Sequence, residues 1–159
     1  MKIKKIVSGG QTGVDSAALD AALEFGIPIG GWVPKGRRNE YNEIIKSDYN
    51  IQETPSVDVN QRTEWNVRDS DATLIIYRMV LKGGTDHTVQ SAINNKKPYL
   101  LIDLSHLSVL DAKQRVSVWL STINGTILNI AGPRDSEDNS IYCDAKELIT
   151  SILRQNCNG

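Results

Sequence analysis

The sequence predicts a single α/β domain with three layers, in which helices cover both faces of a mostly parallel, doubly wound sheet of about six strands. Two observations carry this prediction. Short apolar segments alternate with longer stretches of helical periodicity, which is typical of right-handed βαβ crossovers. The segment 72–77 (ATLIIY) is almost continuously apolar, which indicates a central parallel strand covered on both faces.

Six segments are expected to form the strands, because each is short and is bounded by Gly, Pro or polar residues. They are 3–7, 27–29, 50–53, 72–77, 99–104 and 126–130. The segment 50–53 (NIQE) is the weakest candidate because it is mostly polar. Strand 99–104 follows Lys97-Pro98, and its apolar composition again indicates a buried strand.

Five helices are expected between and after these strands. Residues 14–25 carry alanines at helical spacing, so this helix can lie close on the sheet. The segment 58–69 lacks a clean apolar stripe but contains no helix breaker. The three later helices follow Thr85, cover 109–123 and extend through 145–152, and each has an apolar face at helical spacing.

Length and composition limit the classes of protein to which this chain can belong. A chain of 159 residues suits one domain over 1–159, with 156–159 as a loose tail. The 18 basic and 19 acidic residues give a net charge of −1, which argues against a general nucleic-acid binder. No apolar run resembles a membrane span or a signal peptide, so we expect a cytoplasmic protein without a membrane partner. Cys143 and Cys157 are expected to be free thiols.

The glycine turn Ser8-Gly9-Gly10-Gln11-Thr12-Gly13 joins the first strand to the first helix. Glycines let the backbone approach a ligand closely, and the unpaired amides and dipole of a helix N-terminus attract an anion. The turn therefore predicts a phosphate site at Gly9, Gly10, Gln11, Thr12 and Gly13. The alternative is an ordinary turn between a strand and a helix.

A second glycine loop, Gly83-Gly84-Thr85, follows the fourth expected strand. In a Rossmann-like sheet of order 3-2-1-4-5-6, the first and fourth strands are neighbours, and ligands bind at their carboxyl ends. We therefore expect the two glycine loops to face each other across one phosphate-binding cleft. Gln11, Thr12 and Thr85 would be its neutral donors.

The first glycine turn lacks two common nucleotide-binding patterns. It does not end in the GKS or GKT of a P-loop, which disfavours hydrolysis of a nucleoside triphosphate. It also lacks the GxGxxG pattern followed by a ribose-binding acid about 20 residues later, which disfavours a dinucleotide. A mononucleotide or another compact phosphorylated ligand fits better.

Cationic side chains follow two strands on the same edge of the expected sheet. Lys35, Arg37 and Arg38 lie after the second strand and Arg134 after the last. Arginine can bind an anion through two nitrogens, so Lys35, Arg38 and Arg134 are candidate ligands for a phosphate. The alternative is a set of solvated surface charges.

Other polar residues leave their roles open. The group at 62–68, which contains Arg62, Glu64, Trp65, Asn66 and Arg68, either reaches the cleft or a neighbouring subunit, or forms a solvent face anchored by Trp65. Acidic residues in the first turns of helices, including Asp15 and Asp86, are explained by capping and the helix dipole. Asp86 and His87 could instead form a proton-transfer pair. No His or Cys spacing indicates a protein-bound metal.

Several long blocks of this sequence resemble the molybdenum cofactor carrier protein family. They are SGGQTGVD at 8–15, GWVPKGRR at 31–38, TEWNVRDSDATL at 63–74, GGT at 83–85 and AGPR at 131–134, and the resemblance covers roughly residues 5–153. The family is related to the lysine-decarboxylase-like phosphoribohydrolase superfamily. The resemblance implies a Rossmann-like fold, a homo-oligomer (a dimer or tetramer) and a carried pterin dithiolene with a terminal phosphate, which molybdoenzymes would accept.

The resemblance leaves two kinds of function open. The first is a non-catalytic binding protein that holds molybdenum cofactor by its phosphate. The second is an enzyme that cleaves the N-glycosidic bond of a nucleoside 5′-monophosphate, or a sensor of such a nucleotide. The phosphoribohydrolases have a GGxGTxxE motif with a catalytic glutamate, whereas this chain has no Glu in residues 83–90, and Asp86 would have to replace it.

Overall fold

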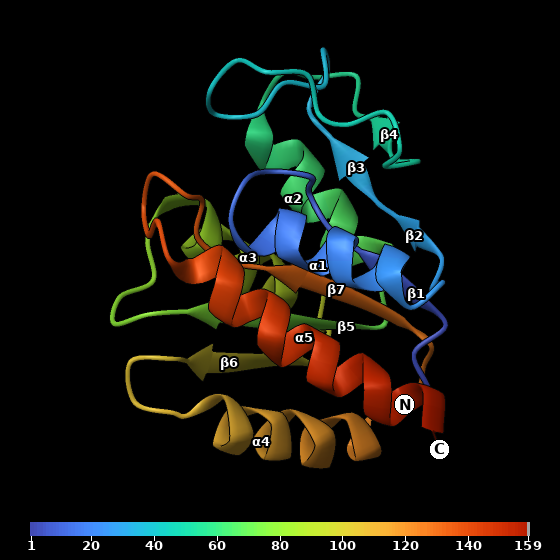
Figure 1. Cartoon of the computed structure of the whole chain (residues 1–159). Coiled ribbons are helices and arrows are strands. Elements are labelled where there is room, and N and C mark those ends of the chain that lie inside the picture. Colours follow the sequence, from blue (N-terminus) through green and yellow to red (C-terminus); the bar gives the residue numbers. More distant parts are fainter. Residues whose placement is uncertain (159) are drawn as a thin grey trace.

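The computed structural model describes residues 1–158 and contains a central sheet of five parallel strands (Figure 1). In chain order these strands are β1 (Lys5–Val7), β2 (Ile29–Gly30), β5 (Ala72–Tyr77), β6 (Tyr99–Asp103) and β7 (Ile127–Ala131). Two further strands, β3 (Trp32–Val33) and β4 (Gln52–Glu53), form a separate parallel pair. The expected strand at 50–53 therefore exists, but it lies outside the main sheet.

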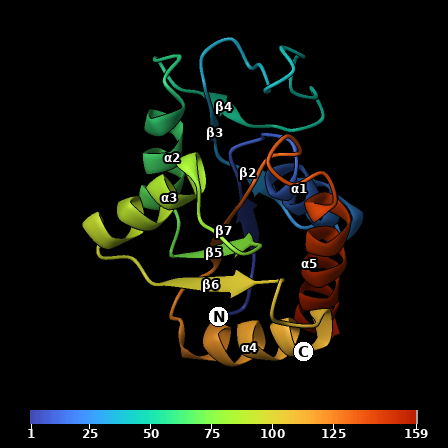
Figure 2. The same cartoon turned by 90° about the vertical axis from the view of Figure 1, so that its left-hand side faces the viewer.

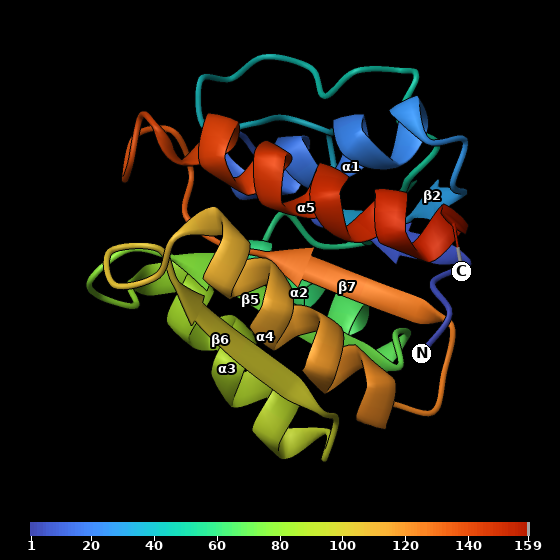
Figure 3. The same cartoon turned by 60° about the horizontal axis from the view of Figure 1, so that its bottom comes forward.

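Five helices enclose the sheet. They are α1 (Val14–Glu24), α2 (Val59–Arg68), α3 (Gly83–Asn94), α4 (Val109–Thr122) and α5 (Ile141–Asn158). α1, α4 and α5 lie together on one face (Figure 3), and α2 and α3 cover the other (Figure 2). This arrangement confirms the predicted three-layer, mostly parallel α/β fold.

The order of the strands corrects one prediction. The main sheet has the order β2-β1-β7-β5-β6, so the first and fourth expected strands, β1 and β5, are not neighbours. β7 lies between them, with Ile6 beside Leu128 and Leu74 beside Ile130. The chain order alone could not show this, because the last strand enters the middle of the sheet instead of extending its edge.

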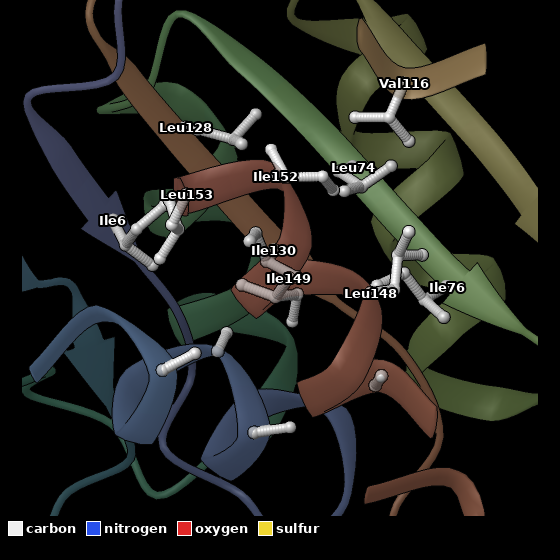
Figure 4. Close-up of a cluster of buried hydrophobic side chains, with 14 of the residues drawn as sticks. Ile6, Leu74, Ile76, Val116, Leu128, Ile130, Leu148, Ile149, Ile152 and Leu153 are labelled. Atoms are coloured by element: carbon white, nitrogen blue, oxygen red, sulfur yellow. The ribbon is translucent and has the colours of Figure 1, made fainter. Parts of the chain in front are cut away.

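The main hydrophobic core lies between the sheet and the helices α1, α4 and α5 (Figure 4). Fully buried strand residues meet α5 there, and the side chains that the figure labels are Ile6, Leu74, Ile76, Val116, Leu128, Ile130, Leu148, Ile149, Ile152 and Leu153. The alanines of α1 are also fully buried, and because they are small this helix packs closely against both β7 and α5.

A second hydrophobic cluster anchors the long segment 34–51. It consists of Leu19 from α1 together with Val33, Ile45, Tyr49 and Ile51. The hydroxyl of Tyr49 also donates a hydrogen bond to Asp20 of α1, as does that of Tyr142 from α5. This segment, largely without regular secondary structure, is therefore fixed at several points.

The C-terminal end differs from the expected loose tail. α5 continues through Asn158, and the side chain of Asn156 bonds both the amide and the carbonyl of Ile3, at 2.8 and 3.0 Å. Gly159, the last residue of the expected tail, lies outside the described residues. Among residues 1–158, no helix has the length and apolar character needed to cross a membrane.

Candidate functional site

A pocket of about 140 Å³ opens at the carboxyl edge of the sheet, where the segments after β1 and β7 meet α2 and α3. It is lined by Gln11, Asp15, Val59, Arg62, Gly84, Thr85, Thr88, Ala131, Gly132, Arg134 and Glu137. A second cavity of about 570 Å³ shares Thr85 and Glu137 with it and extends along residues 78–82 and 133–139. The two expected glycine loops thus contribute to one pocket even though β7 separates their strands.

The N-terminus of α3 is open at this pocket. Gly83 and Gly84 are its first residues, and within the described part of the chain their amides have no hydrogen-bond acceptor. Lys82 precedes them without a side-chain cap. No atom lies within 4 Å of the position that a β-carbon would take at Gly84. Unpaired amides and the helix dipole make such a terminus favourable for an anion.

Two buried side chains have polar groups without a protein partner at the same pocket. Thr85 is 5% exposed, and its hydroxyl makes no hydrogen bond within residues 1–158. Gln11 is 7% exposed. Its side-chain oxygen accepts from the amides of Thr12 and Glu40, while its side-chain nitrogen has no acceptor among the same residues. Neither donor is among the fully buried unpaired atoms of the described residues, so water can reach both, and an anion that displaces this water could accept hydrogen bonds from them.

The glycines of the first turn have close neighbours within the protein. A β-carbon at Gly10 would lie 2.8 Å from Val33, and one at Gly13 would lie 2.2 Å from the carbonyl oxygen of Pro133. The same oxygen accepts from the amide of Val14 at 3.2 Å. Gly10 and Gly13 therefore allow close packing, and the N-terminus of α1 is covered by the chain itself.

Thr12 is held in a network between two distant segments. Its hydroxyl donates to Glu40 and accepts from the amide of Asp135 at 3.0 Å. Glu40 also accepts from the hydroxyl and the amide of Ser136. Burial acts to raise the pKa of Glu40, but hydrogen bonds from Ser136 and Thr12 outweigh it, so that the pKa is lowered. Thr12 therefore joins the segment 34–51 to the loop after β7.

Arg62 and Asp15 form an ion pair at the bottom of the pocket. Nη1 of Arg62 lies 3.5 Å from Oδ2 of Asp15, and the two side chains are 14% and 4% exposed. A β-carbon at Gly9 would lie 1.8 Å from Nη1, so Gly9 makes room for the guanidinium. Burial raises the pKa of Asp15, and the charge of Arg62 and the amide of Gln11 only partly oppose it.

The expected cationic residues separate into two groups. Lys35 is exposed, Arg37 donates to the carbonyls of Ile51 and Tyr49 at 2.6 and 3.1 Å, and Arg38 donates to that of Asn42 at 2.6 Å. Arg37 thus has a structural role in the loop, and the lining of the pocket includes none of the three. Arg134 does line it, with Nε 3.4 Å from Glu137.

Asp86 and His87 point to different surroundings. Asp86 is exposed and does not line the pocket. Nε2 of His87 lies 3.3 Å from Oε1 of Glu64 on α2, so the pairing of His87 is between helices. Trp65 of the same helix packs edge-to-face on Trp32, with ring centroids 4.7 Å apart. Across the described residues, no three His, Cys, Asp or Glu side chains gather as a metal site.

The sequence analysis missed the pairing of Asp15 with Arg62. Asp15 was explained as a capping residue, and Arg62 was left between several roles. The usable signal was the absence of an apolar stripe in α2, because a helix that covers a sheet but buries few apolar residues often presents polar groups to a site.

Together these features define a Rossmann-like α/β protein with a ligand pocket at the carboxyl edge of its sheet. The chain belongs to the circularly permutated YpsA SLOG family, whose model matches residues 6–153. It is similar to the crystal structure, at 1.45 Å resolution, of a putative molybdenum carrier protein from Syntrophus aciditrophicus SB, with 47% identity and a TM-score of 0.93 over 96% of each chain. The family resemblance noted in the sequence is thereby confirmed. A search of curated proteins found no match.

Proposed function

We propose that this protein binds a small phosphorylated ligand, places the phosphate at the N-terminus of α3, and releases the ligand chemically unchanged. The observation that carries the proposal is the coincidence of donors without a protein acceptor among the described residues: the amide of Gly84, the Thr85 hydroxyl and the Gln11 side-chain nitrogen belong to residues that line one pocket, and the amide of Gly83 precedes them at the same helix terminus. A phosphate offers several acceptor oxygens and would satisfy them together.

The adjoining cavity has room for the rest of such a ligand. Its volume of about 570 Å³ lies in the usual range for small-molecule sites. One wall, at residues 78–82, is fixed to the opposite loop by Arg78, whose Nη1 lies 2.7 Å from Asp138. The wall also exposes Met79 and Val80, which offer apolar contact.

Molybdenum cofactor is the ligand that this proposal favours. The support is the 47% identity to a protein described as a molybdenum carrier, together with donors that suit a terminal phosphate. As a carrier, the protein would act in the cytoplasm as a homo-oligomer and would deliver the cofactor to molybdoenzymes.

Replacing Thr85 by Val tests the proposal. The hydroxyl has no partner in the protein, so the variant should keep the fold while losing one hydrogen bond to the phosphate, about tenfold in affinity. Protein purified from a host that makes molybdenum cofactor would be analysed by native mass spectrometry, and molybdenum and phosphate would be quantified.

The matched control is Ser91→Ala, which removes another buried and unpaired hydroxyl of α3 outside the pocket. We expect bound cofactor in the wild-type protein and the Ser91→Ala variant, and clearly less in the Thr85→Val variant. Equal loading of Thr85→Val and wild type, with both folded, would place the phosphate elsewhere.

A second candidate function is hydrolysis of the N-glycosidic bond of a nucleoside monophosphate, in which water adds to the sugar carbon and the base leaves with a proton. The observation that favours it is the buried carboxylate of Asp15 beside Arg62 in the pocket, since burial raises its pKa towards that of a general acid. Asp86 is exposed and outside the pocket.

Incubation with AMP and CMP, with detection of free base, tests this reaction. Base release that Asp15→Asn abolishes would support hydrolysis. If no base is released from either nucleotide, the carrier function remains.

A further inference from the structure

The ion pair between Arg62 and Asp15 is long, and it leaves one nitrogen of the guanidinium without an acceptor among the described residues. A separation of 3.5 Å is at the long end for a charged hydrogen bond, and it involves a single nitrogen of the guanidinium. Nε of Arg62 is buried and has no acceptor among the described residues. An unpaired buried donor destabilises the conformation that contains it. Arg62 therefore lies in a position that another acceptor can readily change.

The charges of the pocket balance before any ligand is bound. Arg62 and Arg134 contribute two positive charges, and Asp15 and Glu137 contribute two negative ones. An entering anion therefore meets little net positive charge unless one arginine moves away from its carboxylate. Arg134 has two carboxylates, Glu137 at 3.4 Å and Glu40 at 3.7 Å, whereas Arg62 has only Asp15. Arg62 is the easier of the two to move.

We propose that an anion bound at the N-terminus of α3 takes Arg62 away from Asp15, and that Asp15 binds one proton from solvent as this happens. The proposal rests on the anion site of the proposed function. It adds that binding of the anion is coupled to uptake of one proton. Asp15 takes up the proton because burial destabilises an unpaired charge. The Asp15 side chain is 4% exposed, and once Arg62 has moved away its carboxyl group is more stable in the neutral form. The direction agrees with the pKa of Asp15, which burial already raises while Arg62 is still present.

The other groups around Asp15 do not replace Arg62. Gln11 and Ser8 offer an amide and a hydroxyl but no charge. The α3 residues that line the pocket are Gly84, Thr85 and Thr88, which do not titrate. From the segment after β7 come Arg134 and Glu137, which pair with each other. His87, the histidine of α3, lies beside Glu64 of α2 and does not line the pocket.

Sulfate is the probe for this proposal, because its charge does not change between about pH 5 and pH 8, where histidine titrates. The wild-type protein would be titrated with sulfate by calorimetry in buffers of different ionisation enthalpy, which gives the number of protons taken up. A parallel NMR titration would follow the amides of Gly84 and Thr85 and the Nε–H group of Arg62.

We expect net proton uptake, at most one proton for each sulfate bound, and an affinity that falls with rising pH by at most about tenfold for each unit. The Nε–H signal of Arg62 should shift together with the amides of α3. Asp15→Asn should bind sulfate without proton uptake and with an affinity independent of pH. His87→Gln is the control for histidine titration and should keep the proton uptake of the wild type.

The possible failures are distinguishable. Sulfate that shifts Gly84 and Thr85 but binds without proton uptake to the wild-type protein overturns the transfer of Arg62 and leaves the anion site standing. Sulfate that shifts neither amide at any pH overturns both proposals. The proton count is measured on the wild-type protein, so the result does not depend on the folding of Asp15→Asn.

Discussion

Gly9 and Arg62 occupy adjoining space, because a β-carbon at residue 9 would lie 1.8 Å from Nη1 and 2.5 Å from Cζ of the guanidinium. The two residues are far apart in sequence. Arg62 belongs to α2, Gly9 belongs to the turn that precedes α1, and these two helices lie on opposite faces of the sheet. The absence of a side chain at residue 9 thus leaves the space that the guanidinium of Arg62 occupies.

Gly9→Ala should destabilise the protein and displace Arg62. The methyl group cannot fit beside the buried guanidinium, and overpacking of this kind costs about 1–3 kcal/mol. Urea unfolding would measure the loss. Gly9→Ala combined with Arg62→Ala should recover part of it, and a double variant no more stable than Gly9→Ala would contradict the contact.

Gly84→Val should leave the fold intact and weaken ligand binding by at least about tenfold. A side chain at this position meets no atom of the protein but enters the pocket at the open end of α3. Asn94→Val, at the other end of the same helix and outside the pocket, is the control for the introduction of a valine into α3. Circular dichroism would check folding and calorimetry the binding; unchanged affinity in Gly84→Val would remove the pocket from consideration.

Glu40→Ala should loosen the segment 34–51. Glu40 accepts hydrogen bonds from the hydroxyls of Thr12 and Ser136, and because water can replace it at these partly buried and exposed donors, their loss costs about 1 kcal/mol. Hydrogen exchange should become faster in this segment and in the loop after β7. Glu43→Ala, whose exposed side chain bonds only Asn39, is the matched control and should change little.

Asp71 should contribute stability that disappears in acid. Hydrogen bonds from the amides of Thr126 and Ile127, at 2.7 and 2.8 Å, lower its pKa below the ordinary 3.8. A group with a lowered pKa stabilises the fold above its unfolded value and loses this effect as the pH falls through the folded value. Asp71→Asn should therefore be less stable than wild type by about 1–2 kcal/mol near neutral pH, and about equally stable near pH 2. Urea unfolding at both pH values gives the comparison, and a constant difference would argue against it.

Ser91→Ala should raise the free energy of unfolding by about 1 kcal/mol. The hydroxyl of Ser91 is buried in α3 without a partner among the described residues, and alanine favours the helix more than serine does. Thermal unfolding monitored by circular dichroism would show a higher midpoint. A lower midpoint would mean that the hydroxyl has a partner, such as an ordered water.

The fold could be predicted because its signals are local. The apolar run of β5 and the alanines of α1 each depend on a few neighbouring residues, and both were identified from the sequence. The order of the strands depends on where β7 enters the sheet, which is decided by packing between distant segments. The position of β7 in the sheet therefore cannot be predicted from the spacing of residues along the chain.

The site could be predicted in part for the same reason. Gly84, Thr85, Gln11 and Arg134 follow strands, and a parallel sheet brings such residues to one edge. Asp15 and Arg62 come together in the space that Gly9 leaves between two layers, and this space cannot be predicted from a sequence pattern. The close neighbours of Gly10 and Gly13, Val33 and Pro133, likewise come from distant segments and could not be predicted from the sequence.

The central place of β7 has a consequence for synthesis on the ribosome. Until residues beyond Ile127 have left the exit tunnel, β2-β1 and β5-β6 are two separate strand pairs with unprotected edges, and no sheet can join them. Arg134 and Glu137 emerge later still, so the pocket is completed only after β7 has been synthesised. A chain truncated before β7 would expose the unpaired edges of two separate strand pairs, which favours recognition by chaperones and proteases.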